Sequence, residues 1–235
     1  MTQTISQYSA KLSLSTALRF GSRSALSKIP QQFHQLTVGI STVQSSNVVR
    51  DLGVHFDSEL TMKQHVSKVV SVCYYQLRKL HHLWRLVNQT VSFVLSRIDY
   101  CNSLLINLPT STIAPLRVQN DAAHLVLGVD HRAHITPVLK QPHWLPVPYR
   151  VQFKIATVMH QVYHHHCHQM RPDNAYITAT RVAVSVRTRT NLGRRAFSVA
   201  GPSVWNILPS SLRLIDSHKQ FRRQLKTYYF NVAFS

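Results

Sequence analysis

The apolar residues after Thr61 recur at steps of three and four, and this spacing is the strongest constraint that the sequence places on the fold. Such steps put side chains on one face of a helix, so they predict a long amphipathic helix that must pack against a partner. Thr61 and Gln64 have capping-box spacing, which predicts that the helix opens at Thr61. The apolar face consists of Met62, Val66, Val69, Cys73, Leu77, Leu80, Trp84 and Val87.

Two further helices are expected after this one. The first covers 91–108 and ends at Pro109, and the second covers 111–127 and ends at Gly128, a residue suited to the left-handed helix terminus. The three helices can bury their apolar stripes against each other, which predicts a helical bundle.

The remaining segments are shorter. Residues 1–47 are rich in Ser, Thr and Gln and predict a loose segment with one strand near 18–20, and alternation around Gly53 predicts a short strand within 45–57. Four prolines in 135–150 predict an extended but ordered connector, because its apolar residues Trp144, Leu145, Val147 and Tyr149 are unsuited to water.

A helix over 151–165 and a basic part with Val/Thr-rich strands over 171–213 are expected next. The last predicted helix covers 217–230, opens with Ser217 and Gln220 at capping-box spacing, and carries the stripe Phe221, Leu225 and Tyr228. The fold class is therefore mainly α with short β segments (α+β), in three parts: 1–47, 48–130 and 131–235.

Charge is the main indication of function. The chain holds 27 Lys or Arg and 8 Asp or Glu, a formal net charge of +19, which favours a polyanionic partner such as RNA or DNA over mere solubility. No apolar run is long enough for a membrane helix, and the start of the chain has no signal-peptide pattern. Three widely spaced cysteines, Cys73, Cys101 and Cys167, favour reduced thiols in the cytoplasm or nucleus.

Four strings occur in order: SRIDYCNSLL (96–105), VQNDAAHLVLG (118–128), HITPVLKQPHWLPVPYRVQFKI (134–155) and RRAFSVAGPSVWNILPSSLR (194–213). Together they resemble the region downstream of the polymerase palm in reverse transcriptases of non-LTR (LINE-type) retrotransposons. FGSRSALSKI (20–29) and VRDLGVHFDSEL (49–60) resemble segments that bridge palm to thumb in the same proteins.

The resemblance implies a fragment of an RNA-directed DNA polymerase from a mobile element. It makes 1–47 a remnant of the palm-to-thumb segment and 48–130 a thumb-like helical domain. The family's catalytic signature, an aromatic and a small residue followed by paired aspartates, is absent. Shortening between Val87 and Phe93, and a collapsed stretch at 12–20, indicate a decayed or truncated copy.

Catalysis by this chain alone is not expected. Two-metal phosphoryl transfer needs clustered carboxylates, and only Asp57 and Glu59 are close in sequence. Because these two acids precede a predicted helix, the favoured interpretation is that they compensate the dipole at its start. A histidine cluster comprises His160, His164, His165, His166 and His168 beside Cys167. His160 and His164 have zinc-compatible spacing, but the Glu of an HExxH motif is missing. The favoured interpretation of the cluster is a solvated helix end. No cofactor, metal or small-molecule substrate is predicted.

The basic segments carry the binding prediction. Arginine suits bidentate phosphate contact, and odd-numbered arginines could share one strand face. The predicted phosphate-binding residues are Arg181, Arg187, Arg189, Arg194, Arg195, Arg222, Arg223 and Lys226. Phe197, Trp205, Tyr228 and Tyr229 could stack on unpaired bases, although aromatic residues at these spacings more often belong to the core. For Trp205 in particular a core position is favoured.

The resulting hypothesis is a non-catalytic polymerase remnant that binds RNA or DNA without sequence preference. The alternatives are a polymerase fragment that works with a palm in trans, a zinc-binding protein built on the histidine cluster, and a host protein-interaction module.

Overall fold

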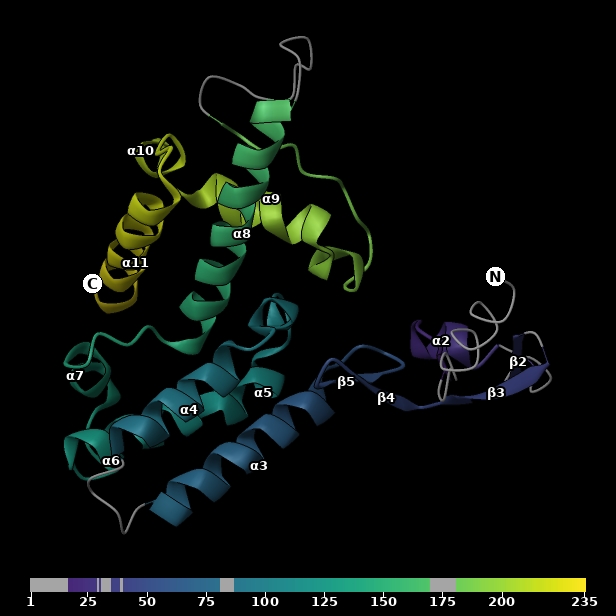
Figure 1. Cartoon of the computed structure of the whole chain (residues 1–235), viewed down its shortest axis with the longest axis horizontal. Helices are drawn as coiled ribbons and strands as arrows, with labels where there is room; N and C mark the ends of the chain where they lie inside the picture. The colour runs from purple at the N-terminus through teal and green to yellow at the C-terminus, as the bar shows by residue number, and fades with distance from the viewer. Residues whose placement is uncertain (1–16, 29, 31–34, 39, 81–86, 170–180) are drawn as a thin grey trace, which may run out of the picture. The chain divides into compact units, whose positions relative to one another are not determined.

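The computed structural model describes residues 17–28, 30, 35–38, 40–80, 87–169 and 181–235. Helices dominate it and the strands are short, which confirms the expected mainly helical class (Figure 1). The contacts between Cα atoms fall mostly within two compact units, Met1–His65 and Val66–Ser235. They are called here the N-terminal unit and the helical unit.

The N-terminal unit contains a small sheet and a hairpin. β1 (Ala17–Leu18) pairs in parallel with β3 (Ser41–Ser46), which pairs antiparallel with β2 (Gln35–Val38). β4 (Val48–Asp51) and β5 (Val54–Asp57) form an antiparallel hairpin, and the short helix α2 covers Arg23–Leu26.

The hairpin turn differs from the single strand predicted around Gly53. Leu52 and Gly53 both have positive φ, 44° and 82°, as the two central residues of a type I′ turn require. The chain therefore reverses at the glycine, and the two runs of apolar residues that flank it become paired strands.

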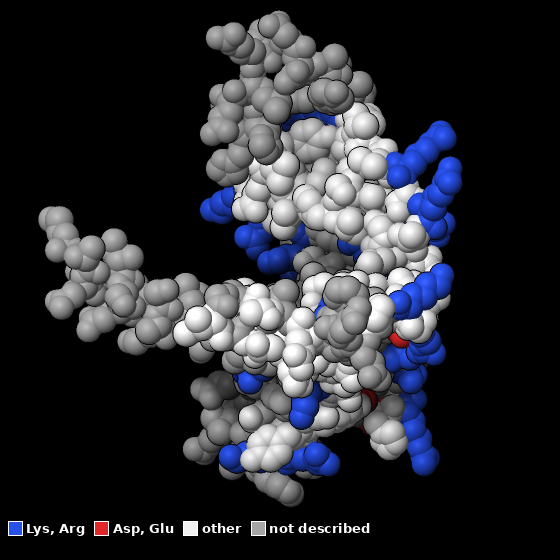
Figure 2. Space-filling model, turned by 90° about the vertical axis from the view of Figure 1, so that its right-hand side faces the viewer, with Lys and Arg blue, Asp and Glu red and all other residues white. Residues whose placement is uncertain are grey.

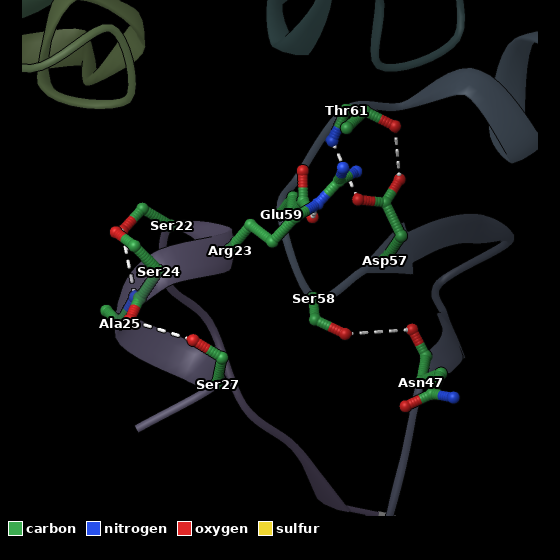
Figure 3. Close-up of polar contacts among 10 residues, drawn as sticks. All are labelled: Ser22, Arg23, Ser24, Ala25, Ser27, Asn47, Asp57, Ser58, Glu59 and Thr61. Atoms are coloured by element: carbon green, nitrogen blue, oxygen red, sulfur yellow. Dashed lines mark hydrogen bonds and ion pairs between the residues drawn. The ribbon is translucent and has the colours of Figure 1, made fainter. Parts of the chain in front are cut away.

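α3 (Lys63–Leu80) follows the hairpin and begins differently from the predicted capping box. The Asp57 carboxylate accepts hydrogen bonds from the Thr61 backbone N–H at 2.8 Å and from the Thr61 hydroxyl at 2.9 Å (Figure 3). It also accepts from the Met62 backbone N–H at 3.1 Å. The Lys63 N–H in turn donates to Thr61 Oγ1 at 3.4 Å. An acidic residue four positions upstream thus satisfies donors at this helix start.

The apolar face predicted for this helix is largely confirmed. Met62, Val66, Cys73 and Leu77 are buried and Val69 is half-buried. Trp84 and the side chains of Leu80 and Val87 lie outside what the structure describes. In the helical unit, Tyr74 Oη donates to the Asp121 carboxylate at 2.5 Å, which ties α3 to the helix that contains Asp121.

The helical unit continues with a series of helices. Their bounds are α4 (Val87–Asp99), η3 (Asn102–Leu105), α5 (Thr110–Ile113), η4 (Ala114–Arg117), α6 (Val118–Leu127), α7 (Ile135–Lys140), α8 (Val147–Gln169), η5 (Gly193–Arg195), α9 (Phe197–Ile207), α10 (Ser210–Arg213) and α11 (His218–Phe234).

The second and third predicted helices are each broken into shorter pieces. The first breaks at Cys101, whose φ of 52° is left-handed, so that 91–108 becomes α4 followed by η3. Residues 111–127 become α5, η4 and α6, and α6 packs on α4. The predicted stop is confirmed, because Gly128 has φ 62° and its N–H donates to the Leu125 carbonyl.

The proline-rich connector is ordered, as predicted, but it is not simply extended. Residues 135–140 form α7, which buries Val138 and Leu139 in a cluster with Ala123. α8 begins at Val147 rather than at 151, since Pro148 in a first turn loses no intrahelical hydrogen bond.

The prediction of strands in 171–213 is wrong for the described part, residues 181–213. Residues 181–189 have no regular structure, and η5, α9 and α10 follow. Trp205 lies inside α9 with 0% exposure, and its Nε1–H donates to the Arg181 carbonyl at 2.6 Å, which confirms its predicted core position. Residues 171–180 fall outside the described chain.

α8 is central to the helical unit and contacts η3, α9 and α11 (Figure 1). The Ser217 side chain accepts from the Gln220 N–H at the start of α11, which confirms half of the predicted capping box. Phe221 and Leu225 are buried as predicted, with Tyr229 rather than Tyr228 as the next buried residue. None of the described helices is long and apolar enough to cross a membrane.

Candidate nucleic-acid interface

Two pairs of cationic residues, one on α8 and one on α11, line a single cavity of about 470 Å³ in the helical unit. Arg150 and Lys154 are four residues apart on α8, and Arg222 and Lys226 are four residues apart on α11. Residues at this spacing share a helix face, and α8 packs against α11, so the four side chains converge. This group is called the cationic cavity.

One carboxylate also lines the cationic cavity, and it already has a partner. Asp99 accepts two hydrogen bonds from the Arg150 guanidinium, from Nε at 2.8 Å and from an Nη nitrogen. The Arg150 side chain is 14% exposed, so this bidentate pair holds it in place. Lys154, Arg222 and Lys226 are exposed, and none forms an ion pair with a described residue.

Aromatic and amide side chains complete the wall. Trp144 lines the cavity and also packs on the cluster formed by α6 and α7, and the His143 ring stacks on Phe230 with centroids 5.3 Å apart. Asn102 is 2% exposed and lines the cavity, and its Oδ1 has no hydrogen-bond partner within the described chain. A buried acceptor without a donor carries a free-energy cost that a bound donor would remove.

The three predicted phosphate-binding residues of α11 do not act as one group. Arg222 and Lys226 line the cavity. Arg223 follows Arg222 by one residue, a rotation of about 100° around the helix axis, and it is absent from the lining. Burial lowers the pKa of the neighbouring His218, and the positive charge of Arg222 lowers it further. The neutral imidazole is thus favoured beside this cluster.

Two other predicted residues have side chains engaged in the fold. The Arg181 guanidinium donates to the Asp216 carboxylate at 2.6 Å and to the Arg213 carbonyl at 3.1 Å, while its own carbonyl accepts from Trp205. Arg195 donates to the Leu104 carbonyl at 3.2 Å. These contacts give both arginines structural roles that the strand-face prediction did not contain.

The remaining predicted residues lie at the surface. Arg187 and Arg189 are exposed in the irregular segment, and no strand aligns them with Arg181. Arg194 is exposed and lines a second, polar cavity of about 550 Å³ with Asn107 and Ser203. Lys and Arg side chains also protrude from the face drawn in Figure 2, where few acidic side chains are visible.

Sequence reasoning missed Arg150, Lys154 and Trp144. The i, i+4 spacing of the two cations was visible inside the string 134–155, but the predicted helix began at 151 and left Arg150 in the connector. Their proximity to Arg222 and Lys226 depends on the packing of two helices that are about 70 residues apart in sequence, which no local pattern encodes.

The histidine cluster does not offer an open metal site at His160. This residue is 0% exposed, its Nε2 contacts the Ile215 carbonyl at 2.8 Å, and its Nδ1 contacts His218 Nδ1 at 3.2 Å. Burial lowers the pKa of His160 to about 4. Among the residues that the structure describes, no group of three or more His, Cys, Asp or Glu side chains is arranged to hold a metal ion. The side chains of His165, His166, Cys167 and His168 are outside that description.

The Cys73 thiol is buried, and the carboxylates Asp57 and Glu59, considered above for metal binding, already have hydrogen-bond partners. Burial raises the pKa of the Cys73 thiol to about 11, which disfavours the thiolate. Asp57 satisfies the donors before α3, and Glu59 accepts from Arg23 Nε at 2.9 Å (Figure 3). Asp57 therefore serves the start of α3, close to the helix-end role favoured from the sequence, and Glu59 pairs instead with a residue of α2.

Comparison with known proteins gives no match: no family model, no curated protein and no solved structure matches this chain.

Proposed function

We propose that this chain is a non-catalytic fragment of a LINE-type reverse transcriptase, comprising thumb-like helices and a basic C-terminal part, that binds RNA or DNA through phosphate groups. Binding is independent of sequence, because contacts to the phosphate backbone carry no base information. The family origin depends on the ordered strings between 20 and 213, since comparison with known proteins adds nothing to it.

One observation carries the binding proposal: the described carboxylates of the helical unit already accept hydrogen bonds within the chain. Each of the four that are described accepts a hydrogen bond from a group of this protein; they are Asp99, Asp121, Asp130 and Asp216. The cations Arg187, Arg189, Arg222, Arg223 and Lys226 are exposed and form no ion pair with a described residue. An excess of this kind attracts a polyanion, and release of condensed counterions supplies the free energy.

Equilibrium binding to short labelled RNAs of unrelated sequence tests the proposal. At about 50 mM salt we expect similar affinities for all of them, because the electrostatic contribution is the same for each backbone. Absence of binding under these conditions, or a strong preference for one sequence, would contradict it.

Two further experiments test whether the chain has polymerase activity and whether it derives from a decayed retrotransposon copy. Purified chain supplied with template-primer, dNTPs and Mg²⁺ should extend no primer, whereas extension would overturn the non-catalytic assignment. At the genomic locus, an upstream palm-coding frame interrupted by stops would support a decayed copy, and a locus without any palm-coding remnant would contradict it.

A further inference from the structure

We propose that the cationic cavity is a binding site for unpaired nucleic acid, in which one phosphate group lies between the α8 and α11 cations and a neighbouring base lies against Trp144 and His143. This inference rests on the proposed nucleic-acid binding and adds a location and a preference for single strands. It predicts that binding is concentrated in one cavity rather than spread over the surface.

The arrangement of charge is the first reason. Like charges four residues apart on a helix repel each other, and here two such pairs on separate helices, α8 and α11, face one cavity. Asp99 offsets only part of this repulsion and is paired with Arg150. A phosphate group between Lys154, Arg222 and Lys226 supplies the missing negative charge, and Arg and Lys side chains are the usual donors to phosphate oxygens.

The cavity wall is the second reason. A volume of about 470 Å³ accommodates a nucleotide, and the lining contains the Trp144 indole and the His143 ring, which Phe230 supports. Stacking on aromatic rings is how single strands are held without sequence preference, because every base has an aromatic face. Bases within a duplex are already stacked, so a duplex offers the cavity only its backbone.

The unpaired acceptor of Asn102 is the third reason and is independent of charge. Asn102 lines the cavity, and its buried Oδ1, which has no donor from the described chain, would become available to a bound donor once the side-chain amide turns toward the cavity. Nucleotides carry donors, the exocyclic amines of bases and the ribose hydroxyl, whereas inorganic phosphate at neutral pH offers mainly acceptors. The wall is therefore suited to a nucleotide more than to a simple anion.

Two double variants on α11 separate this site from diffuse binding. Arg222→Gln/Lys226→Gln removes one Arg and one Lys that line the cavity. Lys219→Gln/Arg223→Gln removes one Lys and one Arg at the same spacing in the adjacent row of the same helix, and neither of these two residues lines the cavity. All four side chains are exposed, so neither double variant removes a buried contact. A thermal melt of each variant checks that the fold is retained.

The probe is a labelled single-stranded oligouridylate at about 50 mM salt. We expect the cavity variant to lose affinity about tenfold or more and the matched control to lose about threefold or less. Equal losses in the two folded variants would overturn the cavity site while leaving the proposed function intact. Failure of the unaltered chain to bind would instead overturn the proposed function itself.

A strand of the same length with abasic positions, together with the duplex form, tests the base contact. Each retains its phosphates but cannot place an unpaired base against Trp144, so we expect binding weaker by about fivefold or more. Binding of the abasic strand as tight as that of the oligouridylate would show that the cavity takes the backbone alone and would overturn the stacking half of the proposal.

Discussion

Two kinds of arginine occur in the helical unit, and they differ in what their guanidinium groups already contact. Arg181 donates to Asp216 and to the Arg213 carbonyl, and it lies beside the buried Trp205, which donates to its carbonyl. Arg222 is exposed at a cavity and has no ion-pair partner within the described chain. Both were predicted to bind phosphate, but only the second is positioned for it.

Arg181→Gln should therefore lower stability more than it lowers nucleic-acid affinity. Loss of the part-buried hydrogen bond to the Arg213 carbonyl is expected to reduce the free energy of unfolding by about 1 kcal/mol, and the pair with the exposed Asp216 carboxylate adds little to it. Urea denaturation measures this change. Arg187→Gln is the control, since its side chain is exposed and should alter stability by less than about 0.5 kcal/mol. Equal stability of the two variants would argue against the structural role.

His160 predicts a dependence of stability on pH. Burial lowers its pKa from 6.5 to about 4 in the folded chain, so the unfolded chain binds the proton more readily between these values. Stability is fully present above pH 6.5 and falls as the pH is lowered toward 4, by roughly 2 to 3 kcal/mol for this residue.

His160→Gln supplies the control for that prediction. A glutamine amide can keep the donor to the Ile215 carbonyl but does not titrate, so the slope of stability against pH should flatten in this range. Denaturation curves at several pH values measure the slope, and an unchanged slope in a folded His160→Gln variant would show that other groups cause it.

At the scale of helices and strands, local signals in the sequence were reliable where one residue type decides the geometry. Gly128 adopts the left-handed conformation that ends α6, and Ser217 accepts from the Gln220 N–H at the start of α11. Local signals were unreliable where the secondary structure depends on packing against other parts of the chain. The Val/Thr-rich stretch after Arg181 forms no strand in its described part, because β-propensity requires a neighbouring strand that the helical unit does not provide there.

The candidate site shows the same limit. The sequence identified Arg222 and Lys226 from their polar helix face, but it could not separate them from Arg223 without knowing which side of α11 packs on α8. Arg150 was missed because four prolines suggested an extended connector up to residue 150, whereas the helix begins at Val147. Without Arg150 on the helix, Lys154 had no partner at the i, i+4 spacing.

Gly128→Ala tests the helix terminus directly. An alanine at φ 62° places Cβ close to the following carbonyl, so the free energy of unfolding should fall by about 1 to 2 kcal/mol. Gly128→Asn is the informative comparison, because asparagine tolerates this conformation and should cost less than alanine. Equal stability of Gly128→Ala and the unaltered chain would mean that α6 does not end at this residue as described.

At the scale of the whole molecule, the central quantity is the formal charge of +19, carried by a chain with only 8 acidic residues. Several described acidic residues serve the fold: Asp57 satisfies donors at the start of α3, Asp99 holds Arg150, and Asp216 holds Arg181. The positive excess is therefore not neutralised by these acidic residues, and the proposed RNA or DNA partner would supply the missing negative charge.

The most direct test is the salt dependence of RNA binding by the full chain. If the cations neutralise several phosphates, the affinity should fall by about tenfold or more between 50 and 200 mM salt, with the logarithm of the binding constant linear in the logarithm of salt concentration. An affinity that does not change over this range, or no binding at its low end, would contradict nucleic-acid recognition through phosphate.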